Sequence, residues 1–163
     1  MSDNEQRRPS RLRAAAEALG TVVVVLSLVF VGLELRQNTA AVRATALNDL
    51  TTGARDWLLA VSTNPDISDL YHRWIEGDTE FTPTERTRMR LLLAAALRGA
   101  ENAFLQTRIG VVDSAALRGY GISGNAAFAS PLFPEIWRNE LRSRFHPDFA
   151  AALDSLYHLG PSR

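Results

Sequence analysis

The sequence predicts an all-α protein, in which one long N-terminal transmembrane helix continues into a small bundle of four to five further helices. Three observations support this prediction. The stretch from Ala18 to Leu33 contains no charged residue. Apolar residues after it recur at spacings of three and four, which is the helical period. No stretch shows the alternation of apolar and polar residues that is typical of a half-buried strand.

The apolar stretch has 16 uncharged residues, which span only ~24 Å of helix against a hydrocarbon core of ~30 Å. Extending it from Ala14 to Leu35, which takes in Glu17 and Glu34, gives roughly 33 Å, and both carboxylates then lie near the membrane interfaces, where a charge costs less. We therefore expect an Arg-rich tail at 1–13, a single transmembrane helix at 14–36 and a helical extramembrane domain at 37–163.

Two other interpretations of this stretch stay open. A buried helix of a soluble protein should carry a polar stripe, but Thr21 and Ser27 are the only hydroxyl residues in the apolar run. A cleaved export signal fits the Arg-rich start. However, Glu34 and Arg36 fall where cleavage would occur. The membrane span is the interpretation we favour.

Arginine residues flank the predicted span on both sides, with a small excess before it. Because basic residues accumulate on the cytoplasmic side, the excess favours a cytoplasmic N-terminus and a main domain on the other side of the membrane, which for a bacterial inner-membrane protein is the periplasm. The residues compared are Arg7, Arg8, Arg11 and Arg13 before the span, and Arg36, Arg43 and Arg55 after it.

The helices of the main domain are predicted from helix-capping and helix-breaking residues and from the spacing of apolar residues. The first helix continues through Thr39–Ser62, with an apolar stripe for packing on a partner helix, and ends at Asn64-Pro65. A short helix from Asp66 to Glu76 follows and is closed by Gly77. The stripe comprises Val42, Ala46, Leu50, Ala54, Trp57 and Val61.

The clearest helix start is "TPTE", Thr82–Glu85, a capping box with Pro83 at the first helical position. This helix should end near Ile109, with Gly110 as its stop, and its many Ala and Gly residues permit a close neighbour. Further helices are expected from Ser114 (capped by Asp113), from Pro134 to about Phe145, and from Pro147 to His158, the last ended by Gly160-Pro161.

Composition excludes several classes of function. The 18 basic residues, all Arg, balance 18 acidic residues, and this zero net charge argues against a nucleic-acid binder. The use of Arg alone fits biased codon usage or a preference for bidentate contacts to carboxylates and phosphates. The absence of Cys excludes disulfides, Cys-ligated metals and Cys nucleophiles.

No motif carries recognisable catalytic chemistry. "GYGISG", Gly119–Gly124, matches a dinucleotide fingerprint but lacks the strand that such a site needs, and Asn125 breaks the nucleophile-elbow pattern around Ser123. His72 shares a helix face with Asp69 and Glu76, which suggests surface pairing or capping. It is also the only place where an enzyme site would be sought. We predict no catalytic residue, no cofactor and no metal site.

Four polar residues lie on the long helix that is rich in small residues. They form either a polar seam, which meets the Arg36-Gln37-Asn38 junction and fixes helix register, or an ordinary solvated face. The residues are Arg98, Glu101, Asn102 and Gln106.

A second set of residues is predicted to contact the membrane or a partner. In "SPLFPEIW", Phe133 and Trp137 belong to an apolar cluster that forms either an exposed docking surface or part of the core. In the span, two glycines permit close contact with other helices and charged residues bracket the apolar run. The predicted interface in the span comprises Glu17, Gly20, Gly32, Glu34 and Arg36.

The segments "LELRQNTAAVRATA", Leu33–Ala46, and "ENAFLQ", Glu101–Gln106, resemble a widespread group of uncharacterised small bacterial proteins. These share an apolar N-terminal helix, an R-Q-N-T junction and an all-helical remainder. The resemblance implies this architecture and a bacterial membrane location. It implies no activity, substrate or catalytic residue.

Together these features predict a non-catalytic accessory or structural subunit of a larger bacterial membrane complex, of respiratory, photosynthetic or secretion type. Its expected partners are lipid and other membrane-protein subunits, without nucleic acid, and a homo-oligomer stays open. The alternative is a membrane-anchored sensor, whose helical domain binds a ligand or protein and passes the change along Thr39–Ser62. An enzyme is the third interpretation and the one we favour least.

Overall fold

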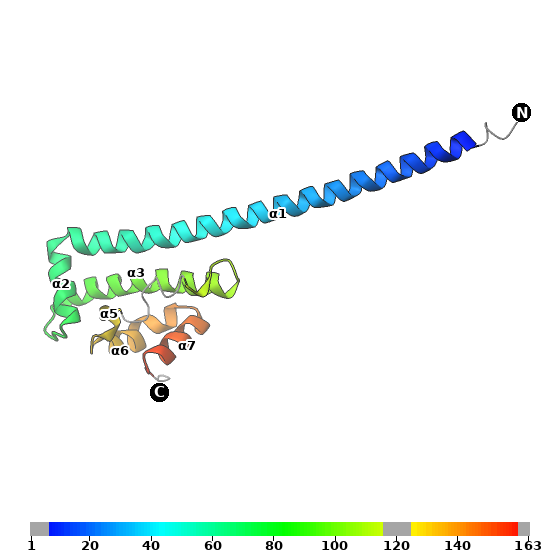
Figure 1. Cartoon of the computed structure of the whole chain (residues 1–163). Helices are drawn as coiled ribbons and strands as arrows, with labels where there is room; N and C mark the ends of the chain where they lie inside the picture. The colour runs from blue at the N-terminus through cyan, green and yellow to red at the C-terminus, as the bar shows by residue number, and fades with distance from the viewer. Residues whose placement is uncertain (1–6, 116–124, 160–163) are drawn as a thin grey trace, which may run out of the picture. The chain divides into compact units, whose positions relative to one another are not determined.

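The computed structural model describes residues 7–115 and 125–159, and the elements in these ranges are helical, without a strand (Figure 1). The chain divides into two compact units between Val42 and Arg43. The first unit holds the N-terminal part of the long helix α1 (Arg7–Thr63), and the second holds the rest of α1 and the smaller helices. The all-α prediction, with a long apolar N-terminal helix followed by smaller helices, is confirmed.

Helix α1 ends where the sequence places a stop. Asn64 is the N-cap of α2 (Pro65–Ile75), and its side-chain oxygen accepts hydrogen bonds from the backbone N–H groups of Asp66 and Ile67 at 3.1 and 3.3 Å. Pro65 occupies the first turn of α2, where its missing N–H costs nothing. The predicted continuation of α1 through Thr39–Ser62 is therefore correct.

The capping box at the start of α3 (Pro83–Arg108) forms as predicted. The Thr82 hydroxyl accepts from the backbone N–H of Glu85 at 3.3 Å, and the Glu85 carboxylate accepts from the backbone N–H of Thr82 at 2.7 Å. The two predicted glycine stops, Gly77 and Gly110, have φ of +82° and +75°, the left-handed conformation that favours glycine.

In the second unit, α3 lies between the last part of α1 on one side and the short helices α5 (Ala126–Ala129), α6 (Phe133–Ile136) and α7 (Pro147–Leu156) on the other (Figure 1). Most of the core lies on the second side. On the α1 side, Ala46 and Leu50 pack against Ala103, which has no exposed surface. Ala103 is thus a buried contact residue of α3 on the α1 side.

The predicted packing stripe of α1 is confirmed over most of its length. Ala46 and Leu50 are buried, and Ala54, Trp57 and Val61 are half-buried. The Trp57 indole N–H donates to the Leu92 carbonyl of α3 at 3.1 Å. Val42, by contrast, is 51% exposed, so the packed part of the stripe begins after it.

The helix predicted from Pro134 to Phe145 is not a regular α-helix. α6 passes into a π-helical turn, η1 (Trp137–Leu141), and then into a 3₁₀ turn, η2 (Arg142–Arg144). Phe133, Trp137 and Leu141 are four residues apart and fully buried. Side chains at this spacing drift by about 40° per step around an α-helix, and a wider π turn keeps them on one face.

The last described helix begins as predicted, with His146 before Pro147 as the N-cap of α7. Helix α5 was not predicted. Of the helix expected from Ser114, only Ser114 and Ala115 lie within the described residues, and there Asp113 accepts from the Ala115 backbone N–H at 2.7 Å. The expected stop at Gly160-Pro161 lies outside the described residues.

Candidate functional site

The first unit presents an apolar surface that nothing within that unit covers. Eleven large apolar side chains between Leu19 and Leu33 are 48–67% exposed. One helix of the described residues is long and apolar enough to cross a membrane, with a mean hydropathy of 2.4 in its most apolar stretch. At roughly 1.5–3 kcal/mol for each large side chain when fully removed from water, covering these half-exposed side chains is worth roughly 10–20 kcal/mol.

The two hydroxyls of the apolar stretch and the charged pair before it find partners within the helix itself. The hydroxyls of Thr21 and Ser27 donate to the carbonyls four residues earlier, at 3.0 and 2.8 Å. Arg13 and Glu17 form the predicted ion pair at 3.2 Å, with both side chains exposed. A helix whose hydroxyls bond to its own backbone presents few unpaired polar groups to hydrocarbon.

The two glycines of the apolar stretch lie on different faces of the helix. A Cβ atom added at Gly20 or Gly32 would meet nothing within 4 Å, so neither glycine is required by packing in this chain. They are twelve residues apart, which places them about 120° apart around the helix. One straight neighbouring helix cannot contact both at once. That Glu34 and Arg36 contact a partner stays a prediction, although both are exposed.

Two residues of the predicted polar seam bind the segment before α7. The Arg98 guanidinium donates to Glu101 at 2.6 Å and to the Arg144 carbonyl at 2.7 Å, and it lies 4.3 Å from the ring centre of Phe145. Glu101, which is buried, also accepts from the His146 backbone N–H at 2.5 Å. This pair therefore fixes the start of α7 against α3, a structural role that the sequence did not predict.

The other two residues of the seam bind each other. The Gln106 side chain donates to the Asn102 side-chain oxygen at 3.0 Å. The remaining side-chain oxygen of Gln106 is buried and accepts no hydrogen bond among the described residues. That the seam meets the Arg36-Gln37-Asn38 junction stays a prediction.

The prediction that Phe133 and Trp137 contribute to an exposed membrane or partner interface is wrong. Both have no exposed surface, and the alternative, a place in the core, is correct. Phe133 packs against Phe128 and Tyr157, with ring centres 5.0 and 5.9 Å away. The Trp137 indole donates to Asp154 at 2.8 Å, and this bond satisfies its polar group inside the core.

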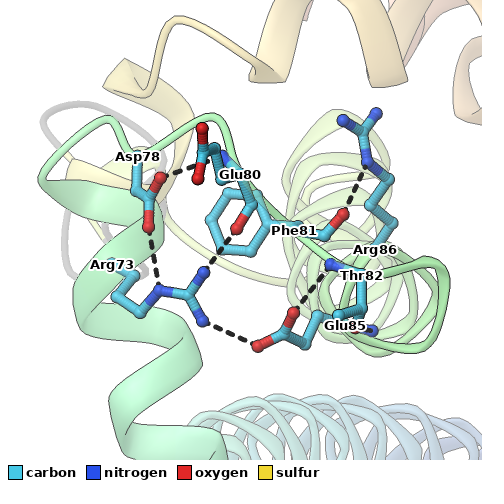
Figure 2. A network of polar contacts seen from close by, with 7 residues as sticks. All are labelled: Arg73, Asp78, Glu80, Phe81, Thr82, Glu85 and Arg86. Carbon is cyan, nitrogen blue, oxygen red and sulfur yellow. Dashed lines mark hydrogen bonds and ion pairs between the residues drawn. The ribbon is translucent and has the colours of Figure 1, made fainter.

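A network centred on Arg73 joins the end of α2 to the start of α3 (Figure 2). Its guanidinium donates to Asp78 at 2.9 Å, to Glu85 at 2.7 Å and to the Glu80 carbonyl at 2.5 Å. It also lies 4.8 Å from the ring centre of Phe81. All the observed contacts are internal, so the network braces the turn between the two helices.

This network lowers the pKa of both carboxyls. The backbone N–H and side chain of Thr82, followed by Arg73, lower the pKa of Glu85 from 4.5 to about 2. The backbone N–H of Glu80 and the Arg73 guanidinium lower the pKa of Asp78. Both carboxylates are therefore charged in the folded protein at neutral pH.

The histidine region considered for an enzyme shows no metal-binding cluster. Among residues 7–115 and 125–159, no group of three or more His, Asp or Glu side chains is placed to hold a metal ion. Asp69 and His72 lie on α2, and Glu76 is its C-cap, so all three belong to this one helix. The "GYGISG" motif and Ser123 lie outside the described residues.

An open groove of about 490 Å³ lies between the last turns of α1, the first turn of α2 and the middle of α3. Its walls are mostly apolar and include Trp57, Ile67 and Leu92. Two charged side chains, Asp56 on α1 and Arg88 on α3, also line it. The sequence did not predict this groove. In the sequence, its two charged residues are marked only by their neighbours: Asp56 precedes Trp57 of the packing stripe, and Arg88 lies one helical turn before Leu92.

Comparison of the chain with protein-family models, with curated proteins and with solved structures finds no match. The resemblance to small bacterial membrane proteins therefore stays a prediction.

Proposed function

We propose that this chain is a single-span, non-catalytic membrane protein that serves as an accessory or structural subunit of a larger bacterial membrane complex. The observation that carries the proposal is the apolar surface of the first unit, where large side chains between Leu19 and Leu33 are about half to two thirds exposed. A bilayer or neighbouring transmembrane helices would cover this surface. In an inner membrane, the distribution of Arg residues favours the orientation that places the second unit in the periplasm.

In the second unit, several charged side chains are occupied by contacts within the fold, which supports a structural role. Arg73 and Arg142 bind carboxylates of other segments, and Arg98 binds Glu101 on its own helix and the Arg144 carbonyl beyond it. These contacts brace the fold. Side chains used in this way hold a docking surface in shape. The subunit would then contribute its shape and its anchor to the complex, rather than chemistry.

The test is to extract the full chain from its native membranes in mild detergent and to measure the native mass of the captured particle. We expect a particle that contains other membrane-protein chains in fixed ratio. A particle that contains only copies of this chain would contradict the proposal.

Variants of the two glycines sharpen this test. Because Gly20 and Gly32 lie on different helix faces, Gly20→Leu and Gly32→Leu should weaken different partner contacts without preventing insertion. Val22→Leu, which enlarges a side chain about 160° from Gly20 and about 80° from Gly32 around the helix, is the matched control. Unchanged co-purification of both glycine variants would show that neither face contacts a partner closely.

A second candidate function is a membrane-anchored sensor, and the groove between α1, α2 and α3 favours it. Its volume of about 490 Å³ lies in the range of small-molecule sites, roughly 300–1,000 Å³. A sensor would change its oligomeric state when a ligand fills the groove. If native-mass measurements of the captured protein show no bound small molecule, the sensor is contradicted.

A further inference from the structure

We propose that the groove between α1, α2 and α3 is a self-association surface that binds a second copy of this chain across a two-fold axis. This inference does not rest on the role of the chain as an accessory subunit. It rests on the charges and apolar side chains that line the groove within the second unit.

The first observation is a pair of unused charges on opposite walls of the groove. Asp56 on α1 and Arg88 on α3 are exposed, and neither side chain forms a hydrogen bond or ion pair with any described residue. Other arginines of α3 are paired: Arg90 binds Glu140 at 2.6 Å, and Arg98 binds Glu101 at 2.6 Å. Arg88 is therefore an arginine of α3 that lines the apolar groove and binds no carboxylate among the described residues.

Symmetry gives these two charges a partner. In a two-fold dimer, the same surface of each copy meets itself, so a contact from residue i to residue j occurs twice. Asp56 of one copy would bind Arg88 of the other, and Arg88 would bind the other Asp56. A surface with one acid and one base on opposite walls meets the requirement for self-complementarity.

This charge pattern decides between the candidate occupants. A lipid chain or an anionic amphiphile would at best pair with Arg88 and would cover Asp56 without a partner, which is costly. A second copy pairs both charges and leaves neither uncompensated. The second copy is therefore the occupant that the groove fits best.

The apolar side chains supply the rest of the surface. Leu91 is 62% exposed at the edge of the groove, and Trp57 and Leu92 are half-buried in its wall. A protruding leucine beside an open apolar groove can insert into the groove of the symmetry mate. The half-buried tryptophan lies where an interface gains most from the exclusion of water.

Charge reversal tests the proposal on the full chain in detergent, with dimer dissociation measured by native mass and analytical ultracentrifugation. Asp56→Arg or Arg88→Asp alone places like charges together at both contacts and should weaken the dimer by about tenfold or more. The double variant Asp56→Arg/Arg88→Asp restores both ion pairs and should restore the dimer. Arg55→Asp, a reversal at an exposed neighbour outside the groove, is the matched control and should have no effect.

A mixing experiment identifies the partner residue. Chains carrying Asp56→Arg and chains carrying Arg88→Asp should each dimerise poorly alone and form a mixed dimer together, because only the mixture pairs opposite charges. The chain contains no Cys, so disulfide trapping is also specific. Differently tagged Asp56→Cys and Arg88→Cys chains should cross-link in membranes, whereas Arg55→Cys with Arg88→Cys should not.

Several results would overturn the proposal. The first is a wild-type chain that stays monomeric, and the second is a monomer that carries lipid or another ligand in the groove. The third is a dimer that persists unchanged in both single charge reversals, because the dimer contact would then lie elsewhere. A dimer that behaves as expected but contains no other chain would support this inference and contradict the accessory-subunit role. The two proposals therefore fail on different results.

Discussion

Leu26→Arg tests the assignment of the apolar stretch directly. Leu26 lies at the middle of Ala18–Leu33 and is 62% exposed on the helix. At the centre of a span, Leu favours insertion by about 0.5 kcal/mol and Arg opposes it by about 2.5–3.5 kcal/mol. The substitution therefore costs about 3–4 kcal/mol, which reduces the insertion equilibrium by a factor of roughly 100 to 1,000.

Because the uncharged stretch is short, its favourable free energy of membrane insertion is small and cannot offset this cost. The assay is the fraction of full-length chain that stays in the membrane pellet after alkaline extraction. Leu58→Arg is the matched control, because Leu58 is also an exposed leucine of α1, at 60%, but lies beyond the apolar stretch. Ala18→Arg, at the edge of the stretch, should be tolerated, since a long side chain there reaches the interface.

The expected order of membrane retention is therefore wild type, Leu58→Arg and Ala18→Arg together, with Leu26→Arg far below them. If Leu26→Arg is retained as well as Leu58→Arg, position 26 does not lie in hydrocarbon and the span is refuted. Equal loss of all three Arg variants would point to general misfolding, and circular dichroism of the extracted chains would detect it.

Three further predictions concern the second unit. Glu85 has a pKa of about 2 in the folded state against an ordinary 4.5, so the folded state binds fewer protons than the unfolded state between these pH values. The free energy of unfolding should therefore fall as pH falls through this window. In urea unfolding at several pH values, Glu85→Gln should be less stable than wild type at neutral pH, and this difference should vanish as pH approaches 2. Phe133→Ala should destabilise the protein by about 3–5 kcal/mol in urea unfolding, whereas Leu156→Ala, 46% exposed, should cost far less. Gly110→Ala should lower the thermal midpoint by a few degrees because φ there is +75°, and Gly20→Ala, in open space, should not.

Local chemistry explains which helix boundaries were predictable. The Asn64 cap, the Thr82–Glu85 capping box and the glycine stops at Gly77 and Gly110 act through atoms within a few residues of each boundary. Such signals depend on the local sequence alone, so they can be recognised without knowledge of the tertiary fold. These four boundaries all form as expected.

The irregular segment from Phe133 to Arg144 shows what local signals miss. Its π turn places Phe133, Trp137 and Leu141 on one buried face, and the Trp137 indole then reaches Asp154, seventeen residues later. The benefit of this distortion comes from distant partners, so periodicity predicted a plain helix. The same cluster of aromatic residues fits both a docking surface and a core, because composition does not reveal which face is covered.

The candidate site was only partly predictable for the same reason. Hydropathy identifies the apolar part of α1, since every face of that stretch is apolar. The groove depends on how three helices meet, and its charges, Asp56 and Arg88, are far apart in sequence. Likewise, the sequence places Glu101 in a polar seam on α3, but its carboxylate accepts a hydrogen bond from the His146 backbone N–H, 45 residues later in the chain.

The distribution of polar contacts links these observations to function. In the described part of the second unit, Arg73 is held by Asp78 and Glu85 and Arg98 by Glu101, so these charged groups are occupied in bracing the fold. Most of the exposed apolar surface lies in the first unit, and the groove adds an apolar surface with two unpaired charges. A chain that satisfies its internal charges and leaves apolar surfaces open is suited to assembly, because uncovered apolar area is what association removes from water. The proposed membrane anchor and the proposed two-fold contact at the groove would both bury apolar surface in this way.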